Sequence, residues 1–298
     1  FNQLNFSHNT INMVSGSHGG TGINVENVQR LTFRNCTFNS NSADQKGGAI
    51  NIDSYDLTFI GCEFINNSSP NEGQNGGALY FGGSHNIELA ECTFNNNRAQ
   101  REGGAICFET GLESFKLSGC TFINCTASQR AFISMTDSNY DGQQQLPHRV
   151  SIEITYCTFS QLESDVDSSV HFIYKDDINF TFRYNTFENL KCTGNYGGSG
   201  LEIDSKRLET SLTGCKFISC QADSSQICVR SKSDESDDPG ETEYIFNDCT
   251  FSYSRDEEQN TRAVYIYDDI RVEFVDCHFD DYTNGGEGFA VKTEATTQ

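Results

Sequence analysis

The residues best suited to acid–base chemistry in this sequence are four pairs of adjacent aspartates. Cleavage of a sugar chain by two carboxyl groups requires them to lie about 5–10 Å apart. Whether any of these aspartates meet that condition depends on the fold that positions them. The pairs are Asp176-Asp177, Asp237-Asp238, Asp268-Asp269 and Asp280-Asp281.

Residue types that bind metals are dispersed along the chain. The six histidines, at positions 8, 18, 85, 148, 171 and 278, form no His-x-x-x-His spacing, and no Cys-x-x-Cys occurs. A structural zinc site needs such convergent ligands. The sequence also has no Gly-x-Ser-x-Gly elbow and no phosphate-binding loop. We therefore predict no catalytic residue, no metal site and no cofactor, with Ca²⁺ at acidic corners as the one alternative.

The thirteen cysteines are an odd number, so at least one cannot pair within the chain. Eight of them recur in the tripeptide Cys-x-Phe. If these tripeptides stack, their side chains point in parallel, which disfavours disulfide geometry, and we interpret them as small buried hydrophobes. Free thiols would suit a reducing compartment, whereas the sequons favour secretion. The Asn-x-Ser/Thr sequons are Asn5, Asn35, Asn66, Asn67, Asn124 and Asn179.

The tripeptide marks an internal repeat of about 30 residues. Its anchors lie 27, 26, 30, 28, 37, 28, 30, 34 and 28 residues apart, and Asn replaces Cys in two of them. Apolar residues lie three and five positions before each anchor and two after it, with Thr210 as the only exception. This period of two indicates strands with one buried face. The anchors are Asn9, Cys36, Cys62, Cys92, Cys120, Cys157, Asn185, Cys215, Cys249 and Cys277.

Units this short bury their apolar face only by stacking on one another, about 4.8 Å apart. No unit contains a helical stretch, and the spacing is shorter than a propeller blade. We predict an all-β fold, a single-stranded parallel β-helix (solenoid) of about ten coils, as one domain over residues 1–298. In that fold Asp176 and Asp268 occupy the same corner three coils apart, about 14 Å. The aspartate pairs are therefore interpreted as solvated turns.

A second block follows the anchors and completes the repeat. Its clearest copies are Gly47–Ile50, Gly76–Leu79 and Gly103–Ile106, all of the form Gly-Gly-Ala-(Ile/Leu). Asn-rich turns separate the two blocks, and we expect their side chains to form amide ladders. Two insertions, near 134–149 and 230–243, are predicted to be exposed loops.

The motifs Phe38–Asn41, Phe64–Asn67 and Phe94–Asn97 have the form Phe-x-x-Asn and alternate with the Gly-Gly-Ala blocks. This pattern resembles the repeat of polymorphic outer membrane proteins, found in chlamydial autotransporter passengers and in large surface proteins of parasitic protists. The resemblance implies a right-handed parallel β-helix and adhesion at a cell surface. It is strongest over residues 31–133 and weakens after residue 157, where the Asn is lost.

The charge balance limits the partners. With 42 acidic and 20 basic residues the net charge is −22, which argues against nucleic acid and anionic lipid. No stretch of 18 apolar residues occurs, so we expect no direct membrane insertion. We predict a non-enzymatic adhesin or structural binding rod, extracellular or at a cell surface, with a protein or glycan partner.

Two alternatives remain open at this point. One is an assembly or scaffold unit of a larger filament or complex, inside or outside the cell, joined laterally or end to end. No capping segment precedes the first coil, so we expect further chain or a partner to cover that end. The other alternative is a polysaccharide-active enzyme similar to pectate lyases.

Overall fold

The computed structural model contains only β-strands among the residues it describes. Its contacts divide the chain into two compact units, Phe1–Leu146 (unit 1) and Pro147–Gln298 (unit 2). The division falls in the insertion expected near 134–149, and the single domain over 1–298 stays a prediction. The structure describes residues 1–7, 10–11, 23–109, 112–130, 132–136, 149–164, 169–192, 198–222, 225–231, 243–252, 262–267, 271–280 and 291–294.

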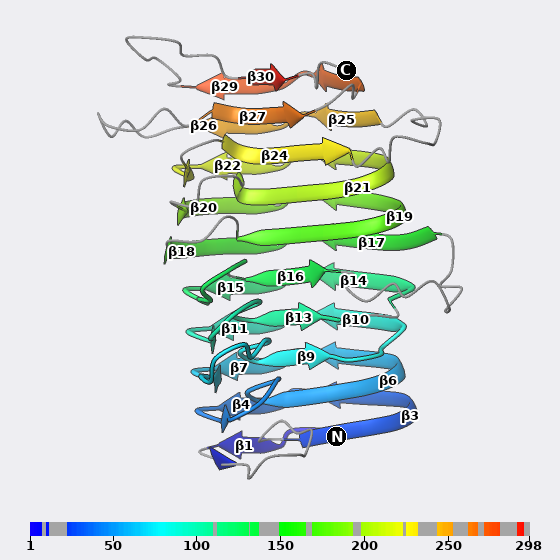
Figure 1. The fold of residues 1–298 in the computed structure, drawn as a ribbon, viewed down its shortest axis with the longest axis vertical. Coiled ribbons are helices and arrows are strands. Elements are labelled where there is room, and N and C mark those ends of the chain that lie inside the picture. Colours follow the sequence, from blue (N-terminus) through cyan, green and yellow to red (C-terminus); the bar gives the residue numbers. More distant parts are fainter. Residues whose placement is uncertain are drawn as a thin grey trace. The chain divides into compact units, whose positions relative to one another are not determined.

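In unit 1 the described strands form three parallel sheets, whose strands stack coil upon coil (Figure 1). In sheet A, β6 pairs with β3 on one side, and on the other side its first and last residues pair with β9 and β10. Sheet A contains β3 (Ile23–Arg34), β6 (Ile50–Ile60), β9 (Leu79–Phe81), β10 (Asn86–Ala90), β13 (Ile106–Phe108), β14 (Ser114–Ser118) and β16 (Ile133–Thr136). Sheet B contains β1 (Asn5–Ser7), β4 (Thr37–Asn39), β7 (Glu63–Ile65), β11 (Thr93–Asn95) and β15 (Thr121–Ile123). Sheet C contains β2 (Thr10–Ile11), β5 (Ser42–Ala43), β8 (Ser68–Ser69) and β12 (Arg98–Ala99).

In unit 2 the described strands repeat the sheet A and sheet B pattern, again in parallel. Sheet A contains β17 (Arg149–Thr155), β19 (Val170–Arg183), β21 (Gly198–Thr213), β24 (Ser225–Ser231), β25 (Glu243–Asn247), β27 (Arg262–Tyr267), β28 (Arg271–Val275) and β30 (Val291–Glu294). Sheet B contains β18 (Thr158–Ser164), β20 (Thr186–Cys192), β22 (Lys216–Ile218), β23 (Gln221–Ala222), β26 (Thr250–Ser252) and β29 (His278–Asp280).

The predicted phenylalanine ladders form the core. Rings of Phe38, Phe64, Phe94 and Phe122 stack with centroids 4.9, 4.7 and 4.7 Å apart, and all four are fully buried. Each buried ring stabilises the fold by roughly 1.5–3 kcal/mol, and each stacked pair adds about 0.5–1.5 kcal/mol. The corresponding ladder of unit 2 contains Phe159, Phe187, Phe217, Phe251 and Phe279.

Residues in the left-handed conformation bound the three-residue core of the sheet B strands. One lies directly before an anchor and one lies four residues after it, with φ between 47° and 62°. Asn tolerates this conformation better than other residues with side chains, which accounts for the Asn-rich turns. The residues before the anchors are Asn35, Gly61, Glu91, Gly119, Tyr156, Tyr184, Gly214, Asp248 and Asp276. Those after the anchors are Ser40, Asn66, Asn96, Asn124, Gln161, Asn189 and Ser219.

The predicted amide ladder is present in unit 1. The Asn67 side-chain oxygen accepts hydrogen bonds from the backbone N–H and the side-chain amide of Asn41, at 3.1 and 3.0 Å. Asn97 accepts the same pair of bonds from Asn67, both at 3.0 Å. All three side chains are fully buried. The Asn of Phe-x-x-Asn is therefore a core residue rather than a surface turn.

The anchor cysteines form no disulfide and are all buried except the half-buried Cys277, which confirms their interpretation as small core residues. The Cys36 thiol donates to the carbonyl of Arg34 two residues earlier, and the same contact recurs at other anchors. Asn185 replaces a cysteine here because its side chain also finds backbone partners. It accepts from the N–H of Cys157 at 2.9 Å and donates to the carbonyl of Ile154 at 2.7 Å.

The Gly-Gly pairs are explained by a close approach between coils. Gly47 has a φ of 74°, and a Cβ placed on Gly48 would lie 2.2 Å from the carbonyl oxygen of Gly77. Gly77 has the same relation to Gly104, at 2.1 Å. Any side chain at the second glycine would push neighbouring coils apart.

One anchor was predicted wrongly. Phe6 pairs with Phe38 and Thr10 pairs with Ser42, so the described residues on both sides of position 9 follow the register of the Phe-x-x-Asn motif and not that of an anchor. The Leu4 carbonyl accepts the N–H of Thr37, as the Cys36 carbonyl accepts that of Glu63, and this places Leu4 at the anchor. Asn9-Thr10-Ile11 imitates the tripeptide at Asn185, and this likeness misled the assignment. Asn9 itself lies outside the described residues.

The predicted all-β right-handed parallel β-helix is confirmed. Complete turns number about seven, slightly fewer than the ten predicted, since the described residues trace the first and last coils only in part. Most of the two predicted insertions, residues 137–148 and 232–242, lies outside the described residues.

Candidate functional site

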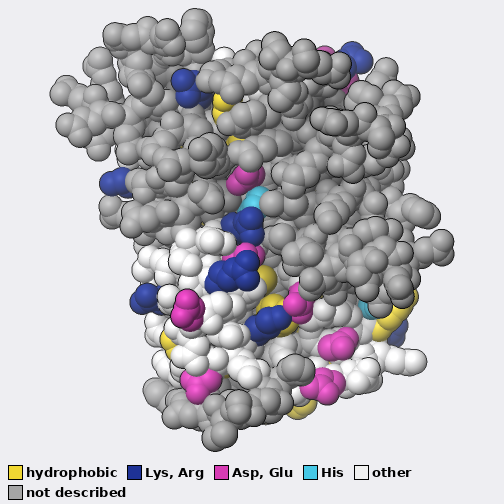
Figure 2. Space-filling model, viewed as in Figure 1, with side chains coloured by type: hydrophobic (Ala, Val, Ile, Leu, Met, Phe, Trp, Pro, Cys, Tyr) yellow, Lys and Arg dark blue, Asp and Glu magenta, His cyan; other side chains and the backbone are white. Residues whose placement is uncertain are grey.

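The chemistry-bearing residues of unit 1 gather on the outer face of sheet A. Tyr80, Cys107 and Ser134 stack in register on β9, β13 and β16, each between two residues that point into the core. All three are nonetheless buried, at 3%, 2% and 0% exposure. Figure 2 shows Lys/Arg and Asp/Glu side chains interleaved over the described part of this face.

Tyr80 belongs to a three-residue cluster. Its hydroxyl donates to the carboxylate of Glu109, while the Lys46 ammonium donates to the Tyr80 oxygen at 2.5 Å and to Glu109 at 2.9 Å. The same ammonium lies 4.5 Å from the centre of the Tyr80 ring. Burial, reinforced by the hydrogen bond to Glu109, raises the pKa of Tyr80 far above its usual value. Tyr80 therefore stays protonated and acts as a donor rather than as a base.

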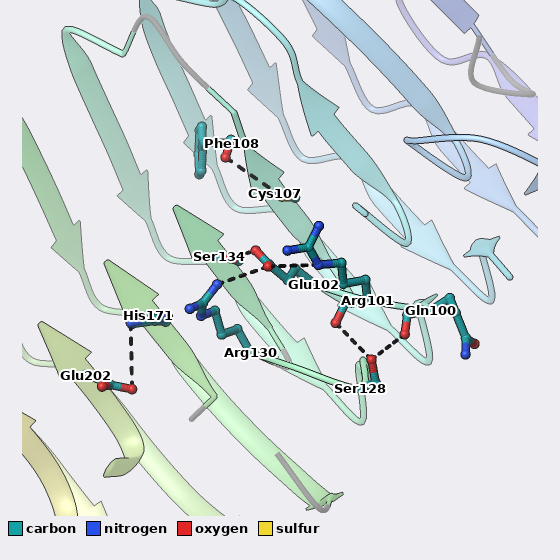
Figure 3. Close-up of polar contacts among 10 residues, drawn as sticks. All are labelled: Gln100, Arg101, Glu102, Cys107, Phe108, Ser128, Arg130, Ser134, His171 and Glu202. Carbon is teal, nitrogen blue, oxygen red and sulfur yellow. Dashed lines mark hydrogen bonds and ion pairs between the residues drawn. The ribbon is translucent and has the colours of Figure 1, made fainter. Parts of the chain in front are cut away.

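A second cluster surrounds Glu102, which is 5% exposed (Figure 3). Its carboxylate accepts a hydrogen bond from the Ser134 hydroxyl at 3.0 Å. Arg130 lies 3.1 Å and Arg101 3.4 Å from the other carboxylate oxygen. Two guanidinium groups and a hydroxyl thus offset the cost of burying this charge.

The Cys107 thiol lies between these two clusters in the strand register and is almost fully buried. Burial, followed by the negative charge of Glu102, raises its pKa well above that of an ordinary thiol. Burial also raises the pKa of Cys125 and of Cys220 to about 12. Since the thiolate is the reactive form, these thiols are inert at neutral pH.

Unit 2 has an equivalent outer column. His171 pairs in register with Glu202, and Glu202 with Cys228. The His171 imidazole Nε2 lies 3.7 Å from the Glu202 carboxylate, and both side chains are almost fully buried (Figure 3). In both units a carboxylate at or beside this column thus lies close to a basic side chain.

Most of the aspartates considered from the sequence lie outside the side chains that the structure describes. Asp176 and Asp177 are in β19, where the structure describes their backbone only. Asp280 is exposed in β29. The other members of the four pairs lie outside the described residues. Among the residues that the structure describes, no group of three or more His, Cys, Asp or Glu could hold a metal ion. The described part also contains no helix long and apolar enough to cross a membrane.

The outer clusters were missed because sequence reasoning followed the apolar columns. The alternation of the second block could have indicated one column. Tyr80, Cys107 and Ser134 each stand between two residues that point into the core, so the repeat itself predicts that they align. The pairing partners could not be found in this way. Lys46 and Glu102 both directly precede a Gly-Gly pair but differ in charge, and Glu109 comes from another position of the repeat.

Parallel strands stacked in register over inward ladders define a β-solenoid. A family model described as right handed beta helix region matches residues 21–221, and this chain belongs to that family. The matched range contains the anchors from Cys36 to Cys215. None of the curated proteins or solved structures compared with the chain matches it.

Proposed function

We propose that this chain is a non-enzymatic binding module of an extracellular or cell-surface protein, an adhesin of the polymorphic outer membrane protein type. The observation that carries the proposal is the mutual pairing of the reactive groups on the outer face of sheet A. Glu102 is engaged by two arginines and a serine, and Glu109 by Lys46 and Tyr80.

A glycoside-cleaving site needs one carboxyl group to supply a proton and another to act as a base or nucleophile. Glu102 and Glu109 are each held by protein donors, and Glu102 is almost fully buried, so it offers little space for a substrate. The same pairing suits a rigid scaffold, because it fixes side chains on the outside of the solenoid. The motif resemblance over residues 31–133 supports the surface location.

The test uses the protein purified from its native cells. We expect no release of reducing or unsaturated sugars from polygalacturonate, for the wild type and for Glu109→Gln alike. Product formation that is lost in Glu109→Gln or Glu102→Gln would overturn the proposal in favour of an enzyme. Glycan mapping of the same sample reports on location, and it has an internal control in adjacent sequons: Asn66 is exposed, whereas Asn67 is fully buried.

A second candidate is an intracellular assembly unit, which the absence of disulfides among the thirteen described cysteines favours. These thiols are mostly buried, and those with a resolved shift have a raised pKa, Cys215 excepted, so the fold tolerates either compartment. A glycan on Asn66 assigns the chain to the secretory route. A bare Asn66 together with filaments in electron micrographs of native material would assign it to the assembly class.

A further inference from the structure

A cavity of about 550 Å³ opens on the surface of unit 1, lined by Gln29, Arg30, Tyr55 and Asp56. Its volume is in the range of small-molecule sites. It lies where β6 bends between its two pairing segments, and β3 has a register shift between Val25 and Val28 at the same level. Such irregularities redirect side chains away from the regular sheet.

The Tyr55 ring is half exposed and held in one orientation. One side of it stacks on His85, with centroids 4.7 Å apart and planes at 28°. His85 is fixed in turn by Glu113, whose carboxylate lies 3.0 Å from Nδ1. His85 precedes β10, whereas the cavity residues Gln29 and Arg30 are in β3, on the opposite side of β6. The ring therefore presents its other side to the cavity.

Polar groups surround the aromatic ring. Arg30 pairs with one Asp56 oxygen at 3.2 Å, and Asn86 donates to the other oxygen, also at 3.2 Å. Each carboxylate oxygen keeps a lone pair for a further donor. The guanidinium, whose side chain is 80% exposed, has donors to spare, and Gln29 adds an amide. The pair is neutral overall, so the cavity offers hydrogen bonds without a net charge.

We propose that this cavity binds a neutral hexopyranose unit of a glycan. The apolar C–H side of a pyranose matches the negative face of the Tyr55 ring. Adjacent sugar hydroxyls match the Asp56 carboxylate and the Arg30 guanidinium as acceptor and donor. An acidic sugar would meet Asp56 and the net charge of −22 of the chain. The ligand class rests on the proposed function, because it names what the binding module would recognise.

The experiment titrates maltose, cellobiose and lactose into the full chain, followed by calorimetry and saturation-transfer NMR. We expect at least one disaccharide to bind, and Tyr55→Ala to weaken its binding by at least about tenfold. Tyr55→Phe keeps the ring and should bind within about twofold of the wild type. Glu113→Ala removes the hydrogen-bond partner of His85 and should weaken binding by less than Tyr55→Ala does. Tyr156→Ala, which removes another exposed tyrosine, is the matched control with unchanged binding.

Several outcomes would overturn the inference. These are no binding by the wild type, unchanged binding in Tyr55→Ala, a loss confined to Tyr156→Ala, or binding of oligogalacturonate alone. Thermal unfolding of each variant separates a lost contact from a lost fold, and Tyr55→Phe retains the test if Tyr55→Ala is unstable. Turnover of a bound sugar in the same samples would refute the non-enzymatic function while leaving the cavity assignment intact.

Discussion

The position five residues after the anchor differs between the two units, although the backbone around it is the same. In unit 1 it holds Asn41, Asn67 and Asn97, joined in an amide ladder, and then Cys125, whose thiol lies 3.7 Å from the Asn97 amide nitrogen. In unit 2 it holds Leu190 and Cys220. All six side chains are buried. One corner geometry therefore accepts either a hydrogen-bonded ladder or an apolar one.

The next segment of chain shows the consequence. In both units a left-handed residue precedes this position, as at Asn66 with φ 54° and Asn189 with φ 53°. After the Asn ladder of unit 1 the chain enters the short strands of sheet C, whereas β18 and β20 of unit 2 run through the corner as single strands of seven residues. At Cys220 the chain breaks instead into β22 and the two-residue β23. The Phe-x-x-Asn motif is thus one of two ways to build the corner. This is why the motif fades after residue 157 while the fold continues.

The largest expected effect tests whether the two units depend equally on their phenylalanine ladders. Phe64→Ala and Phe217→Ala each remove a fully buried ring stacked on both neighbours. Each should lower the free energy of unfolding by about 3–5 kcal/mol. Chemical denaturation measures the loss. A loss below about 1 kcal/mol in either variant would show that its ladder is not a core element.

The second prediction addresses the corner itself. Asn67→Ala removes the acceptor of two bonds from Asn41 and the donor to the carbonyl of Phe38, leaving buried polar groups unpaired. We expect a loss of about 2–3 kcal/mol. Cys220→Ala in unit 2 removes one small side chain and should cost about 1 kcal/mol.

Both variants are measured by urea denaturation against the wild type, since the two positions are equivalent in the repeat. Equal losses would mean that the amide ladder contributes no more than apolar packing does. In that case the hydrogen-bonded corner and the apolar corner would differ in sequence but not in their contribution to stability.

Much of the fold could be predicted because a parallel β-helix repeats its constraints. A buried ring such as Phe64 needs a ring above and below it, so the same residue type returns after each coil and the period becomes visible. The first anchor was misplaced because Asn9 and Asn185 are both followed by Thr and a large apolar residue, and only the pairing partners of the neighbouring strands distinguish them.

The site was harder to predict, since its partners do not repeat. Lys46, Tyr80 and Glu109 come from three different positions of the repeat and meet only through the stacking of coils. Tyr55 and His85 likewise stack at a corner where β3 carries a register shift. Pairwise charge and ring contacts between non-equivalent positions leave no periodic trace in a single sequence.

The smallest effect concerns alkaline pH, where the two units should behave alike. Burial raises the pKa of Cys125 in unit 1 and of Cys220 in unit 2 to about 12. An unfolded thiol ionises near pH 8.5. Because the folded pKa is the higher one, the stabilisation is complete below about pH 8.5 and is lost as the pH rises toward 12.

By about pH 9.5 each thiol should account for a loss of about 1 kcal/mol. Cys125→Ala and Cys220→Ala should therefore be less stable than the wild type at pH 7, yet lose less stability per pH unit above pH 8.5. Urea denaturation at pH 7, 8.5 and 9.5 measures both quantities. One variant could instead lose stability with rising pH as steeply as the wild type, while the other loses it less steeply. That result would show that water reaches one of the two thiols, and the two positions would not be equivalent.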